Sequence, residues 1–198
     1  PDLDAAQEWF CKAIEAGNTE CMRDLGILLA DRLDPPDLDA AQEWYRKAIE
    51  AGNTDAIANI GDLRSRQGDK AGAVDAWRRA LETLGGSRQS IAAARFALAA
   101  LEALDGRKDE ARALLEDVKA SGFVIAAHCA ALLSTNDATR AKARESLAAH
   151  EGDTDALNFL GLAAREANDL AAARIYWNQS AAARDTVAPL LLHLTNGD

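Results

Sequence analysis

The sequence predicts an all-α protein, an α-solenoid of about six antiparallel helix pairs, on three observations. Residues 1–20 return as residues 36–55 with only three substitutions. Apolar residues recur at steps of three and four, a spacing typical of amphipathic helices. The composition, with 48% apolar residues, 27% charged residues and four prolines among 198 residues, suits a folded helical chain. A repeat of this length indicates that one supersecondary unit is copied and stacked.

The second copy shows how the repeated unit is built. Its apolar stripe runs along residues 40–49 and stops at Ala51-Gly52-Asn53. Glycine closes a helix well because it adopts the left-handed conformation without steric cost. A second helix is expected over residues 54–67, and the next stripe, 73–81, begins after Gly68-Asp69. The unit is therefore two antiparallel helices joined by short turns.

Fainter copies extend the array along the rest of the chain. Residues 152–161 match residues 52–61 at an offset of 100, and Trp177 matches Trp77 at the same offset. Further helices are predicted at 91–104, 108–119, 124–133, 138–149 and 186–194. The chain is thus predicted as a single array, 1–198. Its turn at Gly85-Gly86-Ser87 is either a longer loop or a bend near 84–88.

Three pairs of positions resemble the tetratricopeptide repeat. That family pairs Leu-Gly in a first helix with Ala-x-x-x-aromatic in a second, because a small residue lets the backbones approach and an aromatic ring fills the gap. The pairs are Leu25-Gly26 with Ala41 and Tyr45, Ile60-Gly61 with Ala73 and Trp77, and Leu160-Gly161 with Ala173 and Trp177. In the two middle units Ala99 and Ala131 replace the glycine, with Leu115 and Leu147 in place of the aromatic residue.

The first unit resembles the longer Sel-one-like variant of the family. It carries three extra residues at Asp34-Pro35-Pro36, and the string Trp44-Tyr45-Arg46-Lys47-Ala48 continues through Glu50-Ala51-Gly52. The resemblance implies a right-handed superhelix whose first helices line a concave groove for a peptide or helix of a partner protein. The residues expected to face that groove are Arg23, Ile27, Asn59, Asp62, Arg66, Phe96, His128, Asn158, Leu162 and Arg165.

Composition and charge narrow the class of partner. The net charge of −10 and pI near 4.8 argue against broad contact with nucleic acid or an anionic membrane, since both need clustered Lys and Arg. No apolar run of eighteen residues is present, so no membrane span is predicted. Three cysteines do not indicate a disulfide framework, which favours a reducing, cytoplasmic location.

Candidate catalytic and metal-binding residues are few. His128, Cys129 and His150 could offer metal ligands or a Cys–His nucleophile, but their spacing matches no zinc signature and Cys129 lies in an apolar helix. Acidic pairs such as Asp2 with Asp4 stand at helix starts, where they cap free N–H groups and oppose the helix dipole. We therefore predict no catalysis, no metal and no cofactor.

The ends of the chain raise two alternatives. The sequence begins at a second helix and ends after a first helix whose residues Val187, Leu190, Leu191, Leu192 and Leu194 are strongly apolar. Because solenoids normally end in a polar face, we expect either that the array continues in a longer protein or that molecules associate end to end. The main prediction is a protein-binding scaffold. The alternative is a regulatory repeat region of a larger enzyme, ATPase or transcription regulator.

Overall fold

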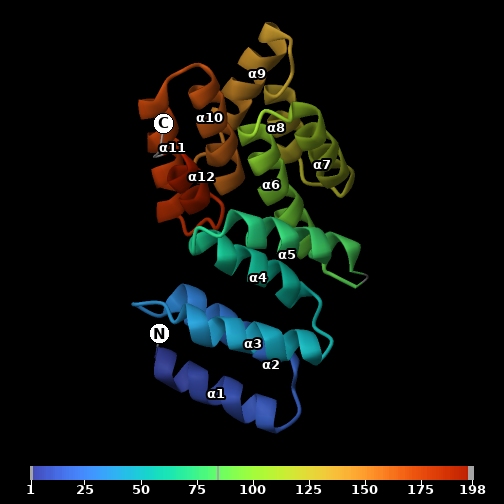
Figure 1. Ribbon diagram of the computed structural model, residues 1–198, viewed down its shortest axis with the longest axis vertical. Helices are drawn as coiled ribbons and strands as arrows, with labels where there is room; N and C mark the ends of the chain where they lie inside the picture. Colours follow the sequence, from blue (N-terminus) through green and yellow to red (C-terminus); the bar gives the residue numbers. More distant parts are fainter. Residues whose placement is uncertain (1, 84, 196–198) are drawn as a thin grey trace.

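The computed structural model describes residues 2–83 and 85–195, and every regular element within them is helical (Figure 1). The elements are α1 (Leu3–Glu15), α2 (Glu20–Ile27), the π-helix η1 (Leu28–Arg32), α3 (Leu38–Glu50), α4 (Asp55–Arg66), α5 (Lys70–Glu82), α6 (Arg88–Leu104), α7 (Lys108–Ala120), α8 (Ile125–Leu132), α9 (Asp137–Ala148), α10 (Thr154–Glu166), α11 (Leu170–Ala182) and α12 (Ala188–Leu194). The all-α class predicted from the sequence is confirmed.

Helix boundaries follow the residues that the sequence marks as starts and stops. Asp2 and Asp37 act as N-caps, because their Oδ1 atoms accept hydrogen bonds from backbone N–H groups three residues later, at 3.0 and 2.9 Å. Gly52, which follows α3 in the predicted stop, has a φ of 92°, a conformation that costs a glycine little. The repeated sequence therefore fixes where these helices begin and end.

Small residues and aromatic rings meet in the pairs that the repeats predict. A Cβ added to Gly26 would lie 2.5 Å from Tyr45 Cε1, and one added to Gly61 would lie 2.5 Å from Trp77 Cδ1. Gly161 stands in the same relation to Trp177. All three rings are buried, so each occupies the space that the absent side chain leaves.

Successive helices pack against one another, and the stack then curls back on itself. Each helix contacts the one before and the one after, while α10 also contacts α6 and α8, and α12 contacts α4. In Figure 1 the last helices lie beside α6 and over α4. Ser65 Oγ donates to the carbonyl of Thr186 at 2.6 Å, and Thr186 Oγ1 donates to Asp62 Oδ1 at 3.3 Å. Residues more than 120 positions apart thus hold the chain in its curled form.

The apolar C-terminal segment packs inside the chain. Val187, Leu190 and Leu191 are buried, and Leu192 and Leu194 pack against the same core. We expected an apolar C-terminal segment to need a further repeat or a second molecule. These apolar side chains instead make their contacts within one molecule. Leu84 of the predicted bend, Pro1 and residues 196–198 lie outside the described residues.

Candidate functional site

Three of the ten predicted groove residues belong to the core. Phe96, Asn158 and Leu162 are only 4%, 2% and 7% exposed. Asn158 donates from Nδ2 to Asp185 Oδ1 at 3.0 Å, and its backbone carbonyl accepts a hydrogen bond from Trp177 Nε1 at 3.2 Å. These side chains hold neighbouring helices together.

Arg23 links the first two units. Its guanidinium donates to Asp24 Oδ1 and to Asp55 Oδ2, both at 3.1 Å. Asp55 Oδ1 in turn accepts a hydrogen bond from the backbone N–H of Ser87 at 2.6 Å. The side chain of Arg23 is therefore already neutralised by carboxylates of its own chain.

Arg66 and Asp62 extend from α4 toward other parts of the chain. Arg66 donates to the carbonyl of Ala30 in η1 at 3.1 Å and forms an ion pair with Asp31 at 2.5 Å. Asp62 Oδ1 accepts a hydrogen bond from Trp77 Nε1 at 3.0 Å, in addition to the one from Thr186. Burial raises the pKa of Asp62 from 3.8 to about 6, although these hydrogen bonds and Arg66 oppose the rise.

Three further predicted residues lie at half-buried positions. Ile27 packs against the N-terminal core cluster, Asn59 lies on α4, and His128 lies on α8 beside His150.

Arg165, the remaining predicted residue, lines a hollow between α6, α8, α9 and α10 together with Leu162. It consists of two adjoining cavities of about 170 and 460 Å³ that share Leu132, Ala163 and Glu166 in their walls. We call it the α8–α10 groove. Its apolar lining comes mainly from Leu104, Leu132, Leu133, Phe159 and Leu162.

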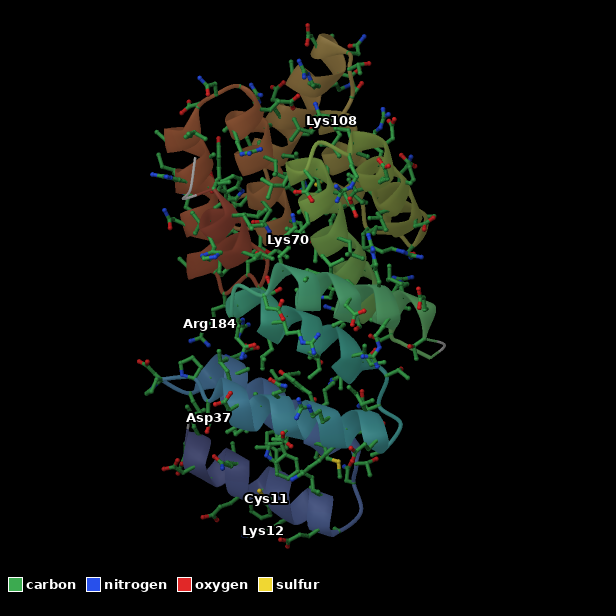
Figure 2. The ribbon with its side chains drawn as sticks, in the orientation of Figure 1. Cys11, Lys12, Asp37, Lys70, Lys108 and Arg184 are labelled. Carbon is green, nitrogen blue, oxygen red and sulfur yellow. The ribbon has the colours of Figure 1, made fainter. Side chains whose placement is uncertain are left out.

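Charged side chains surround this apolar lining. The cations are Lys108, Arg140, Arg144 and Arg165, and the carboxylates are Asp137 and Glu166. Figure 2 labels Lys108 at the start of α7. The groove therefore has more cationic than anionic side chains, although the whole chain has a net charge of −10.

Ion pairs between helices fix part of this rim. Lys108 Nζ contacts Glu166 Oε1, and Arg140 lies 2.5 Å from Asp137 Oδ1 and 3.9 Å from Glu166 Oε1. Arg144 is exposed and makes no hydrogen bond or ion pair within the part of the chain that the structure describes. Its guanidinium is therefore available to an external carboxylate.

One alanine recurs in every second helix, as Ala6, Ala41, Ala73, Ala111, Ala143 and Ala173, and the residues before it carry a pattern that the sequence prediction did not use. Three residues before this alanine, the outer units have Leu3, Leu38 and Leu170. The inner units have Lys70, Lys108 and Arg140 in the same place, and each of these cations forms an ion pair with a carboxylate. Two of these cations, Lys108 and Arg140, lie in the rim of the α8–α10 groove, whereas Lys70 pairs with Asp105 outside it. Figure 2 labels Lys70 and Lys108, the first residues of α5 and α7.

The groove offers an apolar wall and charged side chains for contacts with a ligand. Among residues 2–83 and 85–195, no group of three or more His, Cys, Asp or Glu side chains could hold a metal ion, and no helix has the length and apolar character to cross a bilayer. The smaller cavity falls below the roughly 300 Å³ of sites that hold small molecules, so it suits a single apolar side chain. No family model matches the chain, and no curated protein matches it.

Proposed function

We propose that the chain is a tetratricopeptide or Sel-one-like solenoid that binds an acidic segment of a partner protein in the α8–α10 groove. The proposal joins the repeat pattern to one observation, a cationic rim around an apolar lining in a chain that is otherwise strongly acidic. A segment with a carboxylate and an apolar anchor would complement both parts of this surface.

The expected binding mechanism follows from the burial of the lining. Leu132, Leu133 and Phe159 are held by the core, so an apolar anchor entering between them would meet a preformed wall. A preformed wall lowers the entropy lost on association. Arg144 would meet a carboxylate of the partner, and this exposed contact would weaken as the salt concentration rises.

A charge reversal with a matched control tests this proposal. Arg174 occupies in α11 the place that Arg144 occupies in α9, is also exposed, and makes no described ion pair. Short random peptides displayed on phage would be selected against the wild-type chain, and the Kd of the selected peptides measured against Arg144→Glu and Arg174→Glu. We expect acidic peptides with an apolar residue, and a loss of roughly 1 kcal/mol, about fivefold in Kd, in Arg144→Glu alone.

A second variant tests the apolar lining of the groove independently of its charged rim. Ala163 is half-buried and lies in the wall of both cavities, so Ala163→Leu would fill the space needed by an apolar anchor. Binding should then fall while helicity stays unchanged. Selection of basic peptides, or of peptides that bind both charge-reversal variants equally, would argue against the groove as the binding site.

A further inference from the structure

Two of the three histidines, far apart in the sequence, meet on the surface. His128 lies in α8 and His150 follows α9, and their ring centroids are 5.9 Å apart with the ring planes inclined by 45°. His150 is exposed and His128 is half-buried. The two rings are thus neighbours at a place that solvent ions can reach.

A hydrogen bond of His150 determines which ring nitrogen carries the proton. Its Nδ1 lies 2.8 Å from the carbonyl oxygen of Ser146. A carbonyl oxygen only accepts, so Nδ1 must carry the proton and the neutral ring presents the Nε2 lone pair outward. Metal-binding histidines are commonly held in this way, with one ring N–H donated to a backbone carbonyl. His128 makes no ring hydrogen bond within the described residues, so its nitrogens are also available.

The separation of the rings fits a shared metal ion. With a zinc–nitrogen bond of about 2.05 Å, each ring centroid would lie about 3.2 Å from the metal, so two ligating rings would be about 5.2 Å apart at the tetrahedral angle and about 6.4 Å apart if opposed. The observed 5.9 Å lies between these limits. The separation of the rings is therefore compatible with one ion bound to both.

The sequence alone predicts no metal site, but the proximity of the two rings leads us to propose that His128 and His150 bind one divalent transition-metal ion, such as Zn²⁺, Ni²⁺ or Cu²⁺. Neutral imidazole suits these ions, whereas Mg²⁺ and Ca²⁺ prefer oxygen ligands. Because the described residues contain no cluster of three or more such ligands, water completes the coordination shell. The site joins the middle of α8 to the residues that follow α9 and does not depend on peptide binding in the α8–α10 groove.

Calorimetric titration with Zn²⁺ tests the site, and the chain supplies its own control. Cys11→Ser and Cys21→Ala would first remove the two partly accessible thiols, since the second copy has Arg46 and Ala56 at these places. In that background we expect one ion per chain. His128→Ala and His150→Ala should each weaken binding at least about tenfold. His193→Ala should bind as tightly as the parent, because His193 is the remaining histidine and lies on α12.

Nitrogen NMR of the imidazole rings gives a second readout that does not depend on affinity. We expect His150 to carry its proton on Nδ1 before metal is added, and the Nε2 signal to shift when Zn²⁺ binds. Circular dichroism would check that each variant remains folded. Absence of Zn²⁺ binding by the parent, unchanged binding by either single variant, or an equal loss in His193→Ala would overturn the proposal.

Discussion

Tyr45, Trp77 and Trp177 each fill the space that a missing side chain leaves on the facing helix. The glycines opposite them have no Cβ, and an added one would lie 2.3–2.5 Å from a ring atom, closer than van der Waals contact allows. The middle units solve the same problem differently, since Ala99 and Leu115, which occupy the equivalent places, are both completely buried. Glycine with an aromatic ring and alanine with leucine are therefore two ways to fill the same space between helices.

A double substitution in the first pair tests this complementarity. Gly26→Ala should destabilise the chain, because an overpacking cost of about 1–3 kcal/mol exceeds the roughly 0.8–1 kcal/mol that alanine gains in a helix. Adding Tyr45→Leu recreates the pairing of the middle units and should remove the clash. Urea unfolding of both single variants and the double variant would give the coupling energy. A double variant at least about 0.5 kcal/mol more stable than the sum of the single effects is expected, and strict additivity would refute the explanation.

The same comparison shows which residue contacts a sequence can predict. The glycine and aromatic pairs could be predicted because they recur, and recurrence marks positions that build the scaffold. The partners of Arg66 could not be predicted, since Ala30 and Asp31 lie in η1, and the described residues of the other units form no π-helix. The sequence places the three additional residues of this unit at Asp34-Pro35-Pro36. In the structure the helix before them, Leu28–Arg32, is also a wider π-helix.

At the level of whole elements, α1 and α3 show that the local sequence sets the bounds of a helix, whereas neighbouring helices set its burial. Both helices are 13 residues long, and both start after an aspartate N-cap. In α3, however, Ala41, Tyr45 and Ala48 are buried, whereas α1 buries no residue and leaves Trp9 69% exposed. The difference arises because α3 packs against α2, η1 and α4, whereas the main contacts of α1 are with α2 and η1. Local sequence determines the helix, and packing determines its burial.

Arg66 provides a test of how η1 is stabilised. Its guanidinium joins α4 to the Ala30 carbonyl and to Asp31, so Arg66→Met should lower the free energy of unfolding by about 1–2 kcal/mol, less than a fully buried charged pair because both side chains are partly exposed. The amides of Leu33 and Asp37, which donate to carbonyls of η1, should exchange hydrogen faster.

Arg32→Met is the control for this substitution, since Arg32 lies in the same π-helix but is exposed and makes no described side-chain bond. It should leave stability and amide exchange unchanged. If Arg66→Met also leaves stability and amide exchange unchanged, the side chain is not needed for the fold. That result would favour the prediction that Arg66 contacts a partner.

The candidate groove was predicted only in part for a related reason. Leu162 and Arg165 were found because they lie on a first helix near the repeated glycine, which the family resemblance places on the concave side. Arg140 and Arg144 were missed because they come from α9, a second helix in a degenerate unit. A pattern that assigns binding to first helices cannot identify a groove whose rim is completed by a neighbouring second helix.

Over the whole molecule, the decisive feature is the contact of α12 with α4. It places three carboxylates near one another, because Asp185 lies close enough to both Asp62 and Asp155 to raise their pKa values. Burial is the larger cause in each case. Asp185 itself accepts hydrogen bonds from the N–H groups of Val187 and Ala188, at 2.9 and 2.6 Å, and so caps the last helix. No local pattern predicts this arrangement, since its members come from α4, α10 and the turn before α12.

The raised pKa of Asp62 makes the stability of the curled form depend on pH. Below its ordinary pKa of 3.8 the carboxyl is protonated in both the folded and the unfolded chain, so it imposes no penalty. As the pH rises from about 4 to above 6, the unfolded chain releases this proton before the folded chain does, and the folded state loses stability. A difference of about two pKa units corresponds to roughly 3 kcal/mol.

Asp62→Asn should remove this loss. The amide oxygen can still accept hydrogen bonds from Trp77 Nε1 and Thr186 Oγ1, while the charge that meets Asp185 is gone. Relative to wild type, the variant should therefore gain about 3 kcal/mol between about pH 4 and pH 7, measured by urea unfolding across that range. Asp75→Asn, which replaces an exposed carboxylate on α5, is the matched control. A flat curve for Asp62→Asn, or one that falls as the pH rises, would mean that the carboxyl is ionised without penalty and that the contact of α12 with α4 does not bury it.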